Sequence, residues 1–253
     1  FCLLFSLLLF KSNDLKAQVV FNTSTLSGVG DDFINPTTLQ FGPDGRLYVA
    51  NQVGLIYIFT IQKTSPGNYT VTAKELITLV QQLPNRNDNG SAAPTTSNRQ
   101  ITGILIAGTA ANPIIYVSSS DPRIGGGTTT GDVNLDTNSG IVSKLTWNGS
   151  SWDKTDLVRG LPRSEENHSN NGMELDAATN TLYLAMGGNT NAGSPSTNFA
   201  FITEYTLSAA ILSIDLDLIE SLPTRGSGNT KYKYDLPTLN DPARADIANP
   251  DYN

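Results

Sequence analysis

The chain has 253 residues, of which 38% are hydrophobic and 15% charged, and it carries a net charge of −7. This is the composition of a globular protein long enough for one large domain or two small ones. The acidic balance, with no cluster of lysine or arginine, excludes nucleic acid and anionic membrane surfaces as expected partners.

The N-terminal segment, residues 1–17, is typical of a secretory signal peptide. Its first ten residues (FCLLFSLLLF) are apolar, which is too short a run to cross a bilayer, since that needs about 20 residues. Lys11 and the small residue Ala17 follow in the order expected for export and cleavage. We therefore expect a secreted, cell-surface or periplasmic protein with no membrane span. The alternative is a buried N-terminal strand or helix.

Cys2, the one cysteine of the chain, lies inside this segment. The mature chain would then contain no cysteine, so its stability must come from core burial and not from disulfides.

After a lead-in strand within residues 18–35, the sequence changes to strands and turns. Residues 38–41 (TLQF) and 46–50 (RLYVA) flank Gly42-Pro43-Asp44-Gly45, in which Asp-Gly supplies the positive φ of a tight turn. Residues 54–61 and 69–79 add a third and a fourth strand. Four short antiparallel strands joined by turns are typical of one propeller blade.

The same pattern occurs twice more. The predicted strands are residues 104–106, 114–117, 140–147 and 152–158, and then 173–175, 182–184 and 210–216. Tyr48, Tyr116 and Tyr183 hold equivalent positions in the three units. The repeat is longer than the roughly 40–50 residues of a usual blade, so each unit carries a polar insertion. These insertions, residues 84–98, 121–139 and 188–203, should gather on one face of the molecule.

The predicted fold class is therefore all-β: a β-propeller of four-stranded antiparallel blades, with about three blades of a probable six in residues 36–253. Closed rings have about four to eight blades, so we expect the N-terminal part of a longer protein. Residues 222–253 are predicted to form a long loop. Residues 208–219 could be helical, but their β-branched content favours a strand. An independent β-sandwich is the alternative fold.

His168 is the only histidine in the chain and lies in a polar loop just ahead of a predicted strand pair. Imidazole has an unperturbed pKa near 6.5 and can accept a proton at neutral pH. The alternative is a solvated surface histidine with no role in chemistry.

Three segments around this loop carry a resemblance to a known family. Residues 138–147 (NSGIVSKLTW), 156–162 (DLVRGLP) and 167–172 (NHSNNG), followed by LYLAMGGN, resemble the soluble quinoprotein glucose dehydrogenases, also called the glucose/sorbosone dehydrogenase family. The resemblance covers about residues 35–218. It implies a six-bladed propeller that binds pyrroloquinoline quinone (PQQ) and calcium and oxidises aldose sugars.

The resemblance also implies roles for single residues. His168 would take the proton of the sugar C1 hydroxyl while hydride passes to the quinone, and Gln100 matches a glutamine near the cofactor after a one-residue gap. Asn167 stands where the family has an aspartate, and Asn189 ends a Gly-Gly-Asn that replaces a Gly-Asp, so both are candidate cofactor contacts. The arginine that would polarise the quinone is expected beyond Asn253, so this chain alone should be inactive.

A second candidate site is a run of oxygen-bearing side chains at alternate positions, Asp132, Asn134 and Asp136. This spacing is similar to the start of a calcium loop. The glycine and the glutamate that such a loop needs further on are missing, so an ordinary polar insertion is the alternative.

Trp147 and Trp152 flank a predicted turn at Asn148-Gly149. Their rings could stack on sugars, but their place at a hairpin favours packing between outer strands. No Ser-His-Asp set or zinc motif accompanies the single histidine.

The sequence thus predicts a PQQ-dependent sugar dehydrogenase-like oxidoreductase with His168 as its general base. The rival interpretation is a non-catalytic secreted propeller that binds carbohydrate or protein partners at the cell surface.

Overall fold

The computed structural model describes residues 22–31, 33–87, 91–93, 98–123, 138–192, 196, 199, 204 and 206–236. The predicted signal peptide, residues 1–17, lies outside this part of the chain. The described residues form three β-sheets with one short α-helix and one 3₁₀ turn. The prediction of an all-β, propeller-like array of antiparallel blades is therefore confirmed.

The first sheet, blade 1, is a four-stranded antiparallel meander extended by one parallel strand. Its strands are β2 (Pro36–Phe41), β3 (Leu47–Asn51), β4 (Ile56–Ser65) and β5 (Asn68–Ile77), and β1 (Leu26–Ser27) pairs in parallel with β5. The β2–β3 turn is the predicted one: Gly45 has a φ of 74°, which an L-residue with a Cβ rarely adopts.

The second sheet, blade 2, repeats this design. Its strands are β6 (Gln100–Gly108), β7 (Pro113–Ser120), β8 (Gly140–Trp147) and β9 (Trp152–Leu161), and β13 (Tyr232–Asp235) pairs in parallel with β9. Each predicted strand of this blade lies within or matches an observed one.

The third sheet, blade 3, has three strands within the described residues. They are β10 (Asn170–Asp176), β11 (Thr181–Met186) and β12 (Ile211–Asp215). The predicted last strand, residues 210–216, ends one residue earlier, where helix α1 (Leu216–Ser221) begins. The Asp215 carboxylate accepts a hydrogen bond from the Leu218 backbone N–H at 2.9 Å and so caps this helix.

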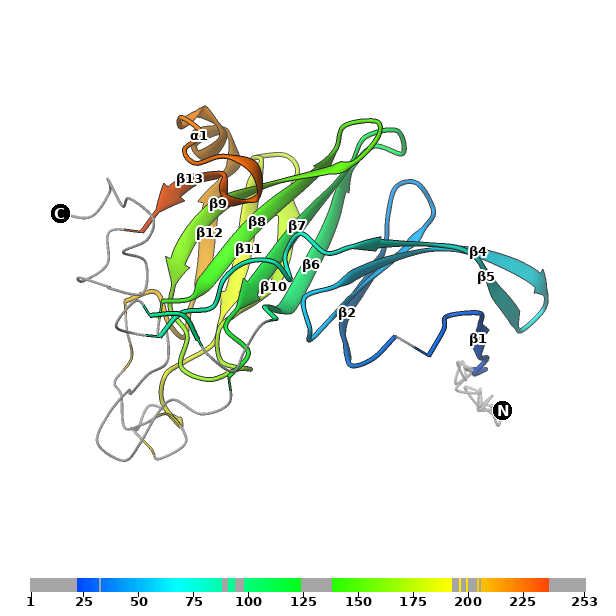
Figure 1. The fold of residues 1–253 in the computed structure, drawn as a ribbon, viewed down its shortest axis with the longest axis horizontal. Helices are drawn as coiled ribbons and strands as arrows, with labels where there is room; N and C mark the ends of the chain where they lie inside the picture. The colour runs from blue at the N-terminus through cyan, green and yellow to red at the C-terminus, as the bar shows by residue number, and fades with distance from the viewer. Residues whose placement is uncertain are drawn as a thin grey trace, which may run out of the picture.

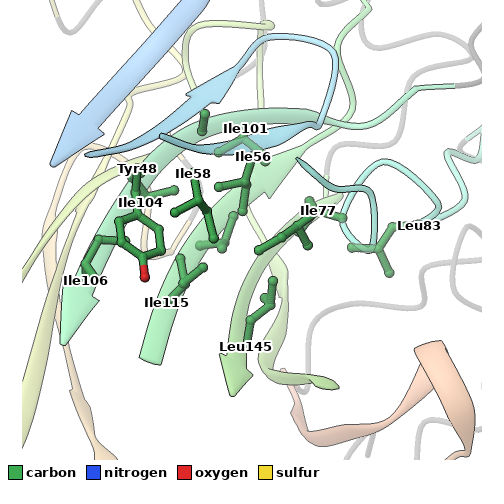
Figure 2. Packing of buried hydrophobic residues seen from close by; sticks show 13 residues of the cluster. Tyr48, Ile56, Ile58, Ile77, Leu83, Ile101, Ile104, Ile106, Ile115 and Leu145 are labelled. Carbon is green, nitrogen blue, oxygen red and sulfur yellow. The ribbon is translucent and has the colours of Figure 1, made fainter. Parts of the chain in front are cut away.

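Neighbouring blades pack through two separate apolar cores. Figure 2 shows the first, where Tyr48, Ile56 and Ile58 of blade 1 meet Ile104, Ile106 and other residues of blade 2. The second core joins blade 2 to blade 3 and α1. Contacts of β6 with β2 and with β10 place the first strands of the three blades side by side (Figure 1). This arrangement of neighbouring first strands is that of consecutive propeller blades.

The prediction that residues 222–253 form a loop is wrong over their described part, which extends to residue 236. Gly228–Thr230 form a 3₁₀ turn and β13 joins blade 2. Arg159 and Asp235, both buried, pair at 2.8 Å, and the Arg159 guanidinium carbon lies 3.5 Å from the centre of the Tyr232 ring. The strand is held by its parallel pairing with β9, by this ion pair and by the ring contact. Tyr232 and Tyr234 do alternate with charged residues, but a run of four residues after a Pro- and Gly-containing stretch is too short to predict a strand.

No helix within the described residues is long and apolar enough to cross a membrane.

Candidate functional site

The loop that carries His168 connects β9 to β10 and folds into a tight turn. The Ser164 N–H donates to the His168 carbonyl at 3.0 Å, and the His168 N–H donates to the Glu165 carbonyl at 3.1 Å. The side chain of Arg163 is buried beneath the loop and its Nε donates to the Asp121 carbonyl at 3.0 Å. The loop is therefore fixed by its own backbone and by the end of blade 2.

Gln100, at the start of β6, anchors the other side of this loop. Its side chain is buried, and its Nε2 donates to the Glu166 carbonyl and to the Ser120 hydroxyl, the latter at 3.2 Å. The Ser120 hydroxyl in turn donates to that of Ser169 at 3.0 Å. The structure thus brings Gln100 to the His168 loop, although it contacts the backbone of the loop and not the imidazole.

The imidazole of His168 is oriented by a backbone carbonyl. Its Nδ1 lies 3.0 Å from the carbonyl oxygen of Gly188, which also accepts a hydrogen bond from the Ser164 hydroxyl at 2.9 Å. A carbonyl can only accept, so Nδ1 carries the proton of the neutral ring and Nε2 keeps its lone pair. The ring is half-buried and packs against Phe199, with the ring centres 4.7 Å apart.

Gly187 explains why β11 can approach the loop so closely. A Cβ at this position would lie 2.7 Å from the His168 Cα and 2.8 Å from its carbonyl carbon. These distances are shorter than real Cβ contacts, so a side chain here would push the loop away from β11. Gly187, the first glycine of the Gly-Gly-Asn segment, therefore has a steric role next to His168.

Glu204 holds the far side of the Gly188 segment. Its carboxylate accepts hydrogen bonds from the Asn189 N–H at 2.8 Å, from the Thr190 hydroxyl at 2.6 Å and from the Ser208 hydroxyl at 2.5 Å. Partial burial raises the pKa of Glu204, but these hydrogen bonds outweigh it and lower the pKa below its ordinary value. The carboxylate is therefore ionised and keeps the segment in place at neutral pH.

Sequence reasoning missed Ser164 and Glu204. Ser164 lies in a polar run where any hydroxyl could be solvated, and Glu204 lies 15 residues beyond the Asn189 N–H that it accepts from. No local signal distinguishes either residue from its polar neighbours.

Asn189 and Asn167, the two predicted asparagine contacts, lie in different surroundings. Asn189 is fully buried, and neither polar atom of its side-chain amide has a hydrogen-bond partner among the described residues. Asn167 is exposed, and its side chain makes no hydrogen bond with the described residues. Of the two, only Asn189 has a buried polar group with unmet hydrogen bonds, which usually indicates a missing partner.

The predicted calcium ligands Asp132, Asn134 and Asp136 lie outside the described residues. Within the parts that the structure does describe, no three His, Cys, Asp or Glu side chains gather as a metal site would require.

The two tryptophans lie away from the His168 loop, at the β8–β9 turn. Trp147 and Trp152 are directly opposite in the strand register, with ring centres 5.6 Å apart. Trp152 packs against the core between blades 1 and 2, and its Nε1 donates to the Glu75 carboxylate at 2.6 Å.

The fold and this loop define a propeller-like chain with a backbone-oriented histidine at one end of its blades. No protein-family model matches the chain, and no curated protein matches it. Among solved structures, an iodide structure of the Trichoderma reesei Carbohydrate-Active Enzymes Family AA12 matches with 17% identity and a TM-score of 0.44, over 75% of this chain and 37% of that one. A calcium structure of the same description matches with 15% identity and a TM-score of 0.43, over 79% and 38%.

This chain thus spans less than half the length of the chains it matches. Because both TM-scores are below 0.5, these structures do not indicate a function, and only the geometry of the site can support one.

The resemblance to the soluble quinoprotein glucose dehydrogenases is wrong as a family assignment. No family model matches the chain, and the structures that it resembles carry a different family description. The error arose because a histidine loop before a strand pair is a short pattern.

Proposed function

We propose that the chain supplies the proton-accepting side of a sugar oxidoreductase site, with Nε2 of His168 as the general base. The single observation that carries this proposal is the contact of 3.0 Å between Nδ1 of His168 and the Gly188 carbonyl oxygen. It leaves the lone pair of Nε2 as the one basic position of the ring. Aldose sugars are the substrate class and export to the cell exterior is the expected location.

A base must be held still as well as unprotonated. The His168 backbone is fixed by its bond with Glu165, and the ring is fixed by Gly188 on one edge and Phe199 on one face. When Nε2 accepts a proton, the Nδ1–H bond to the carbonyl remains, and a carbonyl dipole stabilises the resulting imidazolium. A positioned base of this kind contributes about 10²–10⁴-fold to a rate.

Oxidation of a sugar hydroxyl also needs a hydride acceptor, and PQQ is the one that we propose. The residues present fit such a group in one respect: the buried Asn189 amide has no hydrogen-bond partner among the described residues. A quinone carbonyl or carboxylate oxygen would accept a hydrogen bond from its Nδ2. Bound PQQ would supply two-electron acceptor chemistry, so that the C1–H bond breaks with its electron pair and the O–H proton moves to Nε2 of His168.

The decisive experiment measures dye-linked oxidation in the complete gene product with added PQQ and calcium. A panel of aldoses is offered to the wild-type protein and to His168→Ala, His168→Gln and Gln62→Ala variants, the last a matched control because Gln62 is exposed on β4. We expect turnover that falls about 10²–10⁴-fold in both His168 variants, as loss of a general base predicts, and is unchanged in Gln62→Ala.

Equal turnover in His168→Ala, or no turnover by the wild-type protein with any aldose, would remove the proposal.

The exposed, neutral Asn167 favours one rival function, non-catalytic binding. An asparagine next to His168 cannot stabilise an imidazolium as a carboxylate would. Saturable binding of a sugar by isothermal calorimetry, without any dye reduction, would favour this rival.

A further inference from the structure

Three hydroxyl groups of blade 2 contact the three residues that follow His168, one hydroxyl for each residue. All three donors lie on β6 or β7, the first two strands of blade 2. The contacts, with the donor named first, are Thr102 to the Asn170 carbonyl, Ser118 to the Asn171 carbonyl at 2.5 Å, and Ser120 to the Ser169 hydroxyl at 3.0 Å.

The two carbonyl groups need these donors because β10 begins with an irregularity. The pairing of β10 with β11 shifts its register between Asn170 and Met173. A shift of this kind leaves backbone groups of the ladder unpaired and bends the strand. Asn170 is buried, and a buried carbonyl without a donor destabilises the fold. The hydroxyls of Thr102 and Ser118 therefore replace hydrogen bonds that the ladder does not supply.

The position of Ser118 has no hydroxyl in the other two blades. The residue two positions after the equivalent tyrosine of blades 1, 2 and 3 is, in that order, Ala50, Ser118 and Ala185. Ala50 belongs to the apolar core between blades 1 and 2, so a methyl group is sufficient where one blade only has to pack against the next. The serine occurs in the blade that lies next to the His168 loop.

The end of β7 is also unusually polar for a buried strand. Ser118, Ser119 and Ser120 are its last three residues, and each is 0% exposed. Buried strands are normally rich in β-branched and aromatic residues, and burial of a hydroxyl is unfavourable unless it forms a hydrogen bond. Hydrogen bonds fix a distance and a direction, which apolar packing does not do. The polar end of β7 therefore defines where the start of β10 lies.

Ser169 connects these contacts to the orientation of the imidazole. Its hydroxyl accepts from Ser120, and its carbonyl accepts from the Gly187 N–H at 2.8 Å. The next residue, Gly188, supplies the carbonyl oxygen that orients the ring of His168. A displacement of residue 169 would therefore move both the backbone of the histidine and the acceptor of its ring.

We propose that Thr102, Ser118 and Ser120 are positioning residues for His168. They act through the backbone of residues 169–171 and not through the imidazole, and together they fix where Nε2 lies relative to blade 2. This inference rests on the proposed function only for the role of His168 as a base. The position of the ring itself can be measured without any substrate.

Nuclear magnetic resonance of histidine-labelled protein makes that measurement. The imidazole signals of His168 are those that His168→Gln removes. Thr102→Val keeps the branched shape of the side chain and removes the hydroxyl, whereas Thr102→Ser keeps the hydroxyl. We expect displaced and broadened imidazole signals in Thr102→Val and in Ser118→Ala, and the wild-type signals in Thr102→Ser.

Ser143→Ala is the matched control for loss of a buried hydroxyl. Ser143 is as buried as Ser118 and lies in the same blade, but its hydroxyl donates to the Asp156 carboxylate at 2.6 Å and not to the His168 loop. Urea titrations should show that Ser118→Ala and Ser143→Ala each lower the ratio of folded to unfolded protein about 5–30-fold. Only Ser118→Ala should alter the imidazole signals.

The dye-linked assay in the complete gene product gives a second measurement. A displacement of about 1 Å can lower a rate about 10²-fold, while contacts that bind the substrate equally in the ground state and the transition state are kept. We expect kcat to fall about 10–100-fold in Thr102→Val and Ser118→Ala, with KM changed less than about twofold. Thr102→Ser and Ser143→Ala should behave as the wild type.

Three results would overturn this proposal. The first is a set of wild-type imidazole signals in both Thr102→Val and Ser118→Ala. The second is an equal displacement of these signals in Ser143→Ala, and the third is displaced signals with an unchanged kcat. A wild-type protein without turnover would instead remove the role of His168 as a base, and the imidazole signals alone would then decide whether blade 2 positions the ring.

Discussion

His168 Nδ1 lies 3.0 Å from the carbonyl oxygen of Gly188, a residue 20 positions further along the chain. The β10–β11 hairpin makes this contact possible, because it brings the end of β11 next to the start of β10. There the Gly187 N–H donates to the Ser169 carbonyl at 2.8 Å. The orientation of the imidazole therefore depends on a strand register and not on the loop sequence around it.

This contact predicts the tautomer of the neutral histidine. We expect the Nδ1–H form, read from the ¹⁵N shifts of the ring nitrogens in a long-range proton–nitrogen spectrum. The chain has one histidine, so in untagged protein the signals need no assignment by mutation. An Nε2–H tautomer would contradict both the geometry and the proposed base. In Ser164→Ala the Gly188 carbonyl loses one donor, and we expect a loss of about 1 kcal/mol in unfolding free energy with the tautomer retained.

Between blades 2 and 3, an alanine should be tolerated in place of Gly172 and should destabilise the fold in place of Gly103. A Cβ on Gly103 would meet the Asn171 carbonyl and would lie 2.8 Å from the Ser118 hydroxyl oxygen, whereas one on Gly172 would meet nothing within 4 Å. We expect Gly103→Ala to lower the unfolding free energy by about 1–3 kcal/mol, as overpacking does. Gly172→Ala should change it by less than about 0.5 kcal/mol, as is usual for surface positions. Urea midpoints at constant m-value measure both, and equal effects would contradict the close approach of β6 and β10.

Alkaline pH should destabilise the fold through its buried tyrosines. Burial, aided by the Glu220 carboxylate, raises the pKa of Tyr116 to about 12, and burial followed by the hydrogen bond to Asp44 raises the pKa of Tyr48 as well. A phenol with a raised pKa in the folded state contributes its full stability below the unfolded value near 10 and loses it as the pH rises toward 12.

Removing one of these phenols tests the argument. In Tyr116→Phe, the fall in unfolding free energy between about pH 9 and 11 should be smaller by about 1 kcal/mol. Urea titrations at pH 9, 10 and 11 on the wild type, Tyr116→Phe and Tyr69→Phe measure it, and Tyr69, which is only partly buried on β5, is the control. The same pH dependence in all three proteins would show that Tyr116 titrates freely.

Trp152 should report on the contact between blades 1 and 2. Its Nε1 donates to Glu75 at 2.6 Å, and Trp152→Phe removes this bond while keeping most of the ring. We expect a loss of about 1 kcal/mol, because Glu75 is partly exposed. Trp147→Phe makes the same change in the opposite ring and should cost less. Saturating sugar should leave the fluorescence of both tryptophans unchanged, whereas quenching would support the sugar-stacking alternative.

The strands and turns of the three blades could be predicted from the sequence. Alternating β-branched and aromatic residues indicate strands. Asp44-Gly45 indicates a turn that depends only on local sequence and needs no contact with distant residues. The exception is β13, whose parallel pairing with β9 places Tyr232 opposite Asp156. Partners so far apart in the chain cannot be read from composition.

The candidate site also has one part that the sequence predicts and another that depends on the tertiary structure. The sequence by itself determined that His168 lies in a polar loop before a hairpin, because polar residues between apolar strands remain at the surface. Only the tertiary structure decided which ring nitrogen is free, since that depends on the Gly188 carbonyl and on Glu204, which holds the Gly188 segment from 15 residues beyond Asn189. Hydrogen bonds between distant segments are fixed by strand register and burial, and neither is written in the residues next to the histidine.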